Sequence, residues 1–176
     1  MRDDREIRTY VTAMAASGGI LMRSDKLPLL TEAQLARIEK LFPLNTAAAR
    51  PLDYETAYIP GVLDFGLRGR NRTVALINWG ETEKTFTLPG SAGRHVFEFW
   101  ESRYCGVPAG DYSVAVEPHG CRVYTVTEAG GPAVVGTDAS LVMDVRWEYD
   151  GAFHAAKNKP DETLFAVGPD GALLTL

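Results

Sequence analysis

Cysteine is scarce in this sequence, and long hydrophobic runs are missing. Only Cys105 and Cys121 occur among the 176 residues, which is too few for the disulfide framework of a small secreted domain. No apolar run approaches the roughly 18 residues that a membrane-spanning helix needs. The acidic segment Met1–Glu6 is unlike the basic start of a signal peptide. These features predict a reduced, cytoplasmic protein without a membrane partner.

Excess positive charge and metal-binding motifs are also lacking. The sequence has 18 Lys and Arg residues against 23 Asp and Glu residues, a net charge of −5. Electrostatics therefore gives no reason to expect a nucleic acid as partner. The three histidines, His95, His119 and His154, are far apart and lack the spacing of metal ligands. Because neither a P-loop nor a dinucleotide fingerprint is present, we expect no metal and no cofactor.

The first fifty residues have the pattern of a helix, a short buried strand and a second helix. An amphipathic helix is predicted over residues 4–16, and the glycines of Ser17–Gly19 would end it. The run Ile20–Met22 is apolar without alternation, which is typical of a strand buried on both faces of a parallel sheet. A second helix should begin after Thr31, which forms a capping box with Gln34. The apolar stripes of the two helices would be Ile7, Tyr10, Val11 and Met14, and Leu35, Ile38, Leu41 and Phe42.

This order of elements, over residues 1–50, makes one repeat of a βα barrel, and no other repeat follows in the chain. In such a barrel the loop after each strand lies on the catalytic face. Ser24 and Asp25, in the loop after Ile20–Met22, would then lie near a substrate pocket. The alternative is that both side chains only cap or hold the loop. A single parallel strand leaves its own backbone edges unpaired, so we expect the rest of the chain or a neighbouring chain to cover it.

From about Pro51 the pattern changes to short alternating strands separated by turn clusters. Their regular spacing predicts an antiparallel β-sandwich over residues 51–128. The predicted strands are Val62–Leu67, Arg72–Trp79, Lys84–Leu88, His95–Glu101, Tyr112–Glu117 and Gly120–Glu128. The predicted core residues are Leu63, Phe65, Val74, Leu76, Phe86, Leu88, Phe97, Phe99, Val114, Val116, Val123 and Tyr124.

The last part of the chain, residues 129–176, begins at the joint Gly130–Pro132 and is predicted to add further hairpins to the sandwich. Its strand-like runs are Ala133–Gly136, Ser140–Tyr149, Leu164–Val167 and Ala172–Leu176. The polar segment Ala155–Asp161 would form an exposed connection. The expected fold is therefore mainly β, an antiparallel sandwich preceded by a helix–strand–helix remnant of a βα barrel.

Carboxylates are the side chains most relevant to catalysis, because glycosidases need two of them about 5–10 Å apart. The candidates are Asp25, Glu98, Glu101, Asp144 and Glu148. Glu98 and Glu101 are close in sequence to Trp100 and Tyr104, so a sugar could stack on Trp100 beside a carboxylate. The alternative is that the run Phe97–Trp100 is core on one side and solvated on the other.

Several of these segments are similar to parts of one enzyme family. The residues that carry the likeness at the N-terminal end are Ser17–Met22, Ser24–Leu27 and Leu29–Thr31, within Val11–Leu44, and in the β region Ala75–Trp79 and the hairpin Val116–Tyr124. The first group resembles the end of the catalytic barrel in melibiase-type α-galactosidases of glycoside hydrolase clan D. The second group resembles the C-terminal antiparallel β domain of the same enzymes.

The resemblance implies a retaining hydrolase of terminal α-galactosides that works through two aspartates. In the family the nucleophile follows a lysine on a middle barrel strand, and the acid/base lies on a later strand. Both positions would fall upstream of this sequence. The only Lys-x-Asp motif here is Lys159-Pro160-Asp161, which follows the β region where no barrel strand can form. We therefore do not assign the role of the nucleophile to Asp161, and we expect no catalytic residue in this chain.

Two functions from different classes remain open at the level of the sequence. The chain could be a C-terminal part of an α-galactosidase-like hydrolase, inactive alone, with the remaining barrel or a second copy of itself as partner. It could instead be a non-catalytic carbohydrate-binding or assembly module that uses exposed aromatic residues. The aromatic candidates are Trp79, Trp100, Tyr104 and Trp147. An enzyme with a rearranged site is a third, weaker alternative.

Overall fold

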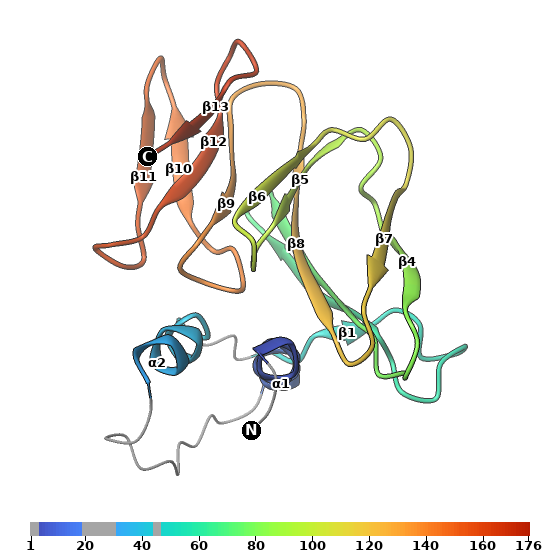
Figure 1. Ribbon diagram of the computed structural model, residues 1–176. Helices are drawn as coiled ribbons and strands as arrows, with labels where there is room; N and C mark the ends of the chain where they lie inside the picture. The colour runs from blue at the N-terminus through green and yellow to red at the C-terminus, as the bar shows by residue number, and fades with distance from the viewer. Residues whose placement is uncertain (1–3, 19–30, 44–46) are drawn as a thin grey trace.

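A computed structural model of the chain describes residues 4–18, 31–43 and 47–176 (Figure 1). The predicted strand Ile20–Met22 and the loop residues Ser24 and Asp25 lie outside the described residues. Two helices precede the strands, α1 (Asp4–Ser17) and α2 (Glu32–Glu39). Neither described helix is long and apolar enough to cross a membrane.

The bounds of α1 and the start of α2 agree with the prediction within a residue, and α2 begins with the predicted capping box. The end of α2 differs: the helix stops at Glu39, before Leu41 and Phe42 of its predicted stripe. The backbone N–H of Gln34 donates to Thr31 Oγ1 at 3.3 Å, and the Gln34 side chain accepts from the Thr31 N–H at 2.9 Å. The predicted apolar stripe of α1 is partly confirmed: Val11 is buried and Ile7 packs against the core. Tyr10 contradicts it, because its side chain is 54% exposed. The buried residues of α1 are Thr9, Val11, Thr12 and Ala16.

A six-stranded antiparallel sheet, here called the main sheet, forms the centre of the molecule. Its order is β1-β2-β3-β8-β5-β6. The bounds are β1 (Arg50–Pro51), β2 (Val62–Arg68), β3 (Asn71–Ile77), β8 (Cys121–Glu128), β5 (Arg94–Glu98) and β6 (Arg103–Gly106). The hairpins β2–β3 and β5–β6 flank β8, which pairs with both β3 and β5. Alternation along these strands gives each face of the sheet its own set of side chains.

The remaining strands form three small antiparallel sheets. The first pairs β4 (Lys84–Leu88) with β7 (Tyr112–Val116). The second has the order β13-β12-β9, with β9 (Ala133–Thr137), β12 (Leu164–Val167) and β13 (Leu173–Thr175). The third is the hairpin of β10 (Arg146–Tyr149) and β11 (Phe153–Ala156).

The main sheet is covered on both faces, which makes the fold a sandwich. In Figure 1 the strands β4 and β7 lie on one side of it, and the helices and the C-terminal strands lie on the other. The first side, here called the dry face, packs apolar and aromatic side chains around Tyr124: Val74, Leu76, Phe86, Leu88, Val96, Val114, Val116 and Val126. The second side is shared. Val11 and Ala16 of α1 pack near Ile77 and Val123, whereas Phe97 packs on β9 and β12.

The mainly β class and the predicted sandwich core are confirmed. All the predicted core residues are buried except Leu63, which is partly buried. Three local expectations are wrong. Within the predicted strand Ser140–Tyr149, only Arg146–Tyr149 is a strand. The first two residues of the predicted connection Ala155–Asp161 belong to strand β11. Strand β6 has no counterpart among the predicted strands. The segment before β10 departs from strand geometry because the Leu141 N–H donates to Lys40 O at 2.9 Å and not to a neighbouring strand.

The run Phe97–Trp100 also differs from its expected half-buried pattern. Phe97, Glu98, Phe99 and Trp100 are all buried, with Glu98 at 0% exposure. Strand β5 ends at Glu98, and the chain then turns beneath α1. Because this end of β5 is covered on both sides, no residue of the run reaches solvent as the alternation had suggested.

Candidate functional site: the face that carries the helices

The contact between α1 and the end of β8 contains polar side chains that are buried. We call it the helix-bearing face and define it by Thr9, Thr12, Glu98, Trp100 and Cys121, each no more than 8% exposed. The hydroxyl of Thr9 lies 2.9 Å from the carbonyl oxygen of His119, and that of Thr12 lies 3.4 Å from Cys121 Sγ. These contacts join residues about 110 positions apart in the chain. The side of α1 that faces the sheet therefore carries threonines as well as Val11 and Ala16, and the position of the helix is specified by hydrogen bonds as well as by packing.

Trp100 lies beneath α1 and not on the surface. Its indole N–H donates to Thr12 Oγ1 at 3.3 Å, and its ring meets Phe99 edge-on with centroids 5.1 Å apart. The Arg8 guanidinium and the Lys40 ammonium lie 5.8 Å and 6.0 Å from the ring centroid. The ring faces are thus occupied by the protein itself, so Trp100 offers no platform on which a sugar could stack.

Glu98 is the described candidate acid whose carboxyl pKa is shifted by its surroundings. Burial raises the pKa of its carboxyl group, because the charged form loses its hydration. Oε2 accepts the N–H of Glu101 at 2.6 Å, and Oε1 has no hydrogen-bond partner among the described residues. Such a raised pKa can mark a general acid. With no exposed surface, however, Glu98 cannot touch a substrate in this fold.

A small pocket of about 250 Å³ opens beside the N-terminal end of α1. It is lined by Asp4, Arg5, Arg8, Glu101, Glu117, Cys121 and Arg122. Arg8 binds Asp4 at 3.2 Å and Glu101 at 2.6 Å, and Arg122 binds Glu117 at 2.6 Å. Partial burial raises the pKa of Glu117, but its backbone hydrogen bond and Arg122 outweigh that effect and lower it. Carboxylates held ionised in this way accept hydrogen bonds and do not donate protons.

The thiol of Cys121 does not supply a nucleophile to this pocket. Burial raises its pKa, which favours the neutral thiol over the reactive thiolate. Cys105 and Cys121 are both free thiols in the structure. The pocket therefore has polar groups suited to holding α1 and lacks an activated acid or nucleophile.

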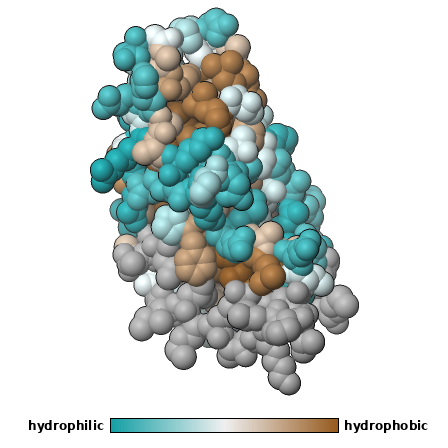
Figure 2. Space-filling view, turned by 90° about the vertical axis from the view of Figure 1, so that its left-hand side faces the viewer, coloured by the Kyte–Doolittle hydropathy of each residue, from teal (hydrophilic) through white to brown (hydrophobic). Residues whose placement is uncertain are grey.

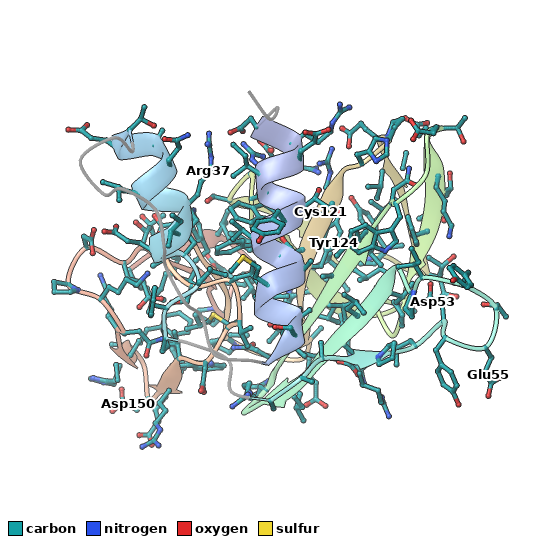
Figure 3. The ribbon with its side chains drawn as sticks, turned by 90° about the horizontal axis from the view of Figure 1, so that it is seen from below. Arg37, Asp53, Glu55, Cys121, Tyr124 and Asp150 are labelled. Atoms are coloured by element: carbon teal, nitrogen blue, oxygen red, sulfur yellow. The ribbon has the colours of Figure 1, made fainter. Side chains whose placement is uncertain are left out.

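The C-terminal end of α2 is held by residues that lie about 100 positions later in the sequence. Lys159 Nζ donates to Glu39 O at 2.6 Å and to Ala139 O at 2.7 Å. The Leu141 N–H donates to Lys40 O at 2.9 Å, and Lys40 Nζ donates to Asp138 O at 2.7 Å. The last carbonyls of a helix have no partner within it, so Lys159 and Leu141, in the segments that connect the C-terminal strands, supply donors. Figure 3 shows Arg37 of α2 between the two helices, where it pairs with Asp4 of α1.

A second buried carboxylate lies at the other end of the main sheet. Asp64 of β2 accepts two hydrogen bonds from Arg72 at 3.1 and 3.2 Å and one from Arg50 at 3.1 Å. It also accepts the N–H of Gly66, whose positive φ of 84° lets the strand bulge. Burial raises the pKa of Asp64, but Arg72 and Gly66 outweigh it, and the pKa is lowered. This group is a structural anchor and not a proton donor.

The remaining candidate acids are dispersed. Glu101 pairs with Arg8, Asp144 lies 3.8 Å from Arg68, and Glu148 is exposed on the hairpin β10–β11. Among the described residues no group of three or more His, Cys, Asp or Glu side chains could hold a metal ion. The structure thus brings Trp100 and Glu98 onto the helix-bearing face, with Glu101 next to them in the pocket, and leaves Asp144 and Glu148 apart.

Sequence reasoning missed Thr9 and Thr12, which specify where α1 lies. The available signal was their spacing: two threonines three positions apart, next to Val11 and Ala16 on the same side of the helix. Helical periodicity marks which residues share a side. It does not tell which side a sheet will cover when both sides carry apolar residues.

Comparison with solved structures finds this fold in glycosidases. The α-galactosidase I of Mortierella vinacea is 18% identical with a TM-score of 0.59, over 73% of this chain and 36% of that chain. A GH27 β-L-arabinopyranosidase from Geobacillus stearothermophilus is 18% identical with a TM-score of 0.61, over 73% of this chain and 31% of its own. This chain has the same fold as one part of the α-galactosidase structures. The resemblance inferred from the sequence is thereby confirmed at the level of the fold.

A third solved structure aligns with more of the chain. The isomaltodextranase of Arthrobacter globiformis T6, in complex with panose, is 18% identical with a TM-score of 0.53, over 93% of this chain and 30% of its own. No protein-family model and no curated protein matches the sequence. The chain spans about a third of the length of the solved structures it resembles.

Proposed function

We propose that this chain is the C-terminal part of an α-galactosidase-like glycoside hydrolase, in which it has a structural role and carries no catalytic residue. In this proposal residues 1–50 are the end of the catalytic barrel, residues 51–128 the β-sandwich domain, and residues 129–176 an extension of it. Its partner is the remaining barrel or a second copy of the chain, its place in the cell is the cytoplasm, and the substrates of the whole enzyme are terminal α-galactosides.

One observation carries the structural role: the helices are built into the β domain. Thr9 and Thr12 fix α1 against β8, and Lys159 fixes the end of α2. A β domain that holds the last helices of a barrel in this way would stabilise that barrel. The fold likeness to glycosidases over a third of their length supports the same arrangement.

The absence of catalysis is supported by the positions of the described acids. Glu98 is inaccessible, Glu101 and Glu117 are paired with arginines, and Asp161 follows the turn that Lys159 anchors. Glu101 and Glu117 line one pocket with Asp4, but their pairing with Arg8 and Arg122 makes them hydrogen-bond acceptors, whereas glycoside hydrolysis also requires a carboxyl group that donates a proton. Ser24 and Asp25 remain the proposed substrate contacts of the complete barrel.

Hydrogen exchange tests the structural role. If α1 is part of the β domain, its amides should exchange with protection close to that of β8, because both open only on global unfolding. Rapid exchange of α1 beside a fully protected β8 would contradict the proposal. Hydrolysis of a chromogenic α-galactoside tests the second part: the purified chain should show no turnover, whereas turnover that is lost in Asp25→Ala would reveal a catalytic chain.

A further inference from the structure

Four large side chains are exposed around the loop between β1 and β2, which is not part of the helix-bearing face. Between β1 and β2, Tyr54 is 65% exposed, Tyr58 is fully exposed and Ile59 is 54% exposed. Trp79, just after β3, is 39% exposed, and its indole N–H donates to Pro60 O at 2.9 Å. We call these residues the aromatic loop. Exposed apolar side chains gathered in this way mark binding surfaces.

The loop is held in one conformation by Asp53. Its carboxylate accepts the N–H of Gly61 at 3.0 Å and that of Val62 at 3.1 Å, and its carbonyl accepts the N–H of Ala57 at 2.9 Å. In Figure 3 Asp53 lies nearer the strands and Glu55 lies at the outer edge of the loop, away from α1. Because the backbone is already ordered, little further conformational entropy is lost when a ligand binds.

The polar groups of the aromatic loop are mostly acceptors. Glu55 accepts from the Tyr54 hydroxyl at 3.2 Å, and Glu81 and Glu83 follow Trp79 closely in sequence. Lys84, the next base along the chain, lies with its ammonium 4.6 Å from the ring centroid of Phe86. This surplus of negative charge opposes an anionic ligand such as nucleic acid or an acidic lipid surface.

We propose that the aromatic loop binds a neutral polysaccharide, with Tyr54, Tyr58 and Trp79 as stacking residues and Glu55 as an acceptor for sugar hydroxyls. A pyranose ring has an apolar face of C–H groups, which packs on an aromatic ring, and an edge of hydroxyl donors, which need acceptors. The aromatic loop offers both. Aromatic rings also have few rotatable bonds, so they lose little side-chain entropy on contact.

Several aromatic rings at one loop distinguish it from the other exposed large hydrophobic residues, whose aromatic members are Tyr10 of α1 and Phe42 after α2. In the upper part of Figure 2 hydrophobic side chains appear over the C-terminal strands. The exposed side chains of β13 are the aliphatic Leu173 and Leu174, 47% and 40% exposed. They lack a flat ring and a polar tip, so they serve as a matched control.

The inference rests on the proposed function only in the choice of an α-galactosyl polysaccharide as the first probe.

The test is electrophoresis of the full chain in native gels that contain galactomannan, with dextran gels in parallel. Wild-type protein should be retarded in proportion to the polysaccharide concentration. Tyr58→Ala and Trp79→Ala should each weaken the retardation about fivefold or more, since each removes one aromatic contact. Tyr58→Phe should retain it, because the ring remains, and so should Leu173→Ala.

Several outcomes would overturn the inference. Migration unaffected by either polysaccharide would do so, and so would equal retardation of wild type and Tyr58→Ala. Thermal unfolding of each variant checks that the fold is intact. If Trp79→Ala does not fold, the double variant Tyr54→Ala/Tyr58→Ala is tested in its place. A dimer in light scattering that Tyr58→Ala dissociates would assign the loop to a second copy of the chain instead. Failure of the proposed function would appear separately, as fast exchange in α1.

Discussion

The two covered faces of the main sheet are built in different ways. The dry face packs Leu88 and Val116 of the two-stranded sheet β4–β7 against Val74 and Leu76, all at 0% exposure. The helix-bearing face also has an apolar cluster, and within it Thr12 and Trp100 are joined by a hydrogen bond. Apolar packing is not directional and scales with the area removed from water, whereas hydrogen bonds require one orientation. The dry face therefore stabilises the fold through apolar packing, whereas the helix-bearing face in addition fixes where the helices lie.

The comparison is tested most strongly by matched valine truncations. Val116→Ala on the dry face should lower the free energy of unfolding by about 2–3 kcal/mol, because two buried methyl groups are lost and a cavity remains. Val11→Ala on α1 should have a smaller effect, since alanine favours the helix and offsets part of the loss. Urea denaturation measures both. Equal losses would show that the two faces contribute alike.

Asp64, at the edge of the dry side, should matter next. Asp64→Asn weakens charge-assisted hydrogen bonds from Arg50 and Arg72, so we expect a loss of about 2 kcal/mol at pH 7. The folded pKa lies below the unfolded value near 3.8, so the contribution of the carboxylate is present above that value and disappears as pH falls through the folded pKa. The gap between wild type and variant should narrow below about pH 4. Leu67→Ala, an exposed neighbour, is the control.

On the helix-bearing face, Thr12→Val should lower stability by about 1–2 kcal/mol. The change keeps the shape but removes the acceptor for the Trp100 N–H, which is then buried without a partner. Hydrogen exchange should show α1 opening more often than in wild type while β8 remains protected. Thr12→Ser, which keeps the hydroxyl, should restore most of the protection. If exchange in α1 were unchanged, the hydrogen bond would not position the helix.

The smallest expected effect has the opposite sign. Burial raises the pKa of Glu98 above the unfolded value near 4.5, so its ionised form is destabilising at neutral pH. Glu98→Gln keeps an oxygen for the Glu101 N–H and should raise the free energy of unfolding at pH 7 by up to about 1 kcal/mol. The gain should vanish as pH falls towards 4, where wild-type Glu98 is protonated in both states. A loss of stability at pH 7 would contradict the assigned burial.

Local pattern was sufficient for most of the strands and for the core. The boundaries of β4 and β12 and the capping box at Thr31 agree with expectation, because alternation and caps depend on residues a few positions apart. Trp100 shows the limit of such reasoning. Its sequence neighbours suggested an exposed aromatic beside carboxylates, and the structure buries it under a helix 88 residues away.

The sequence by itself determined the class of the fold, because turn residues and period-two alternation act over short distances. Only the tertiary structure decided which side of α1 is buried, which carboxylates are ionised and what caps α2. Each of those properties depends on residues far apart in the chain, such as Thr12 with Cys121 or Lys159 with Glu39. A side chain's pKa and exposure are set by what packs against it, and that is known only once the chain has folded.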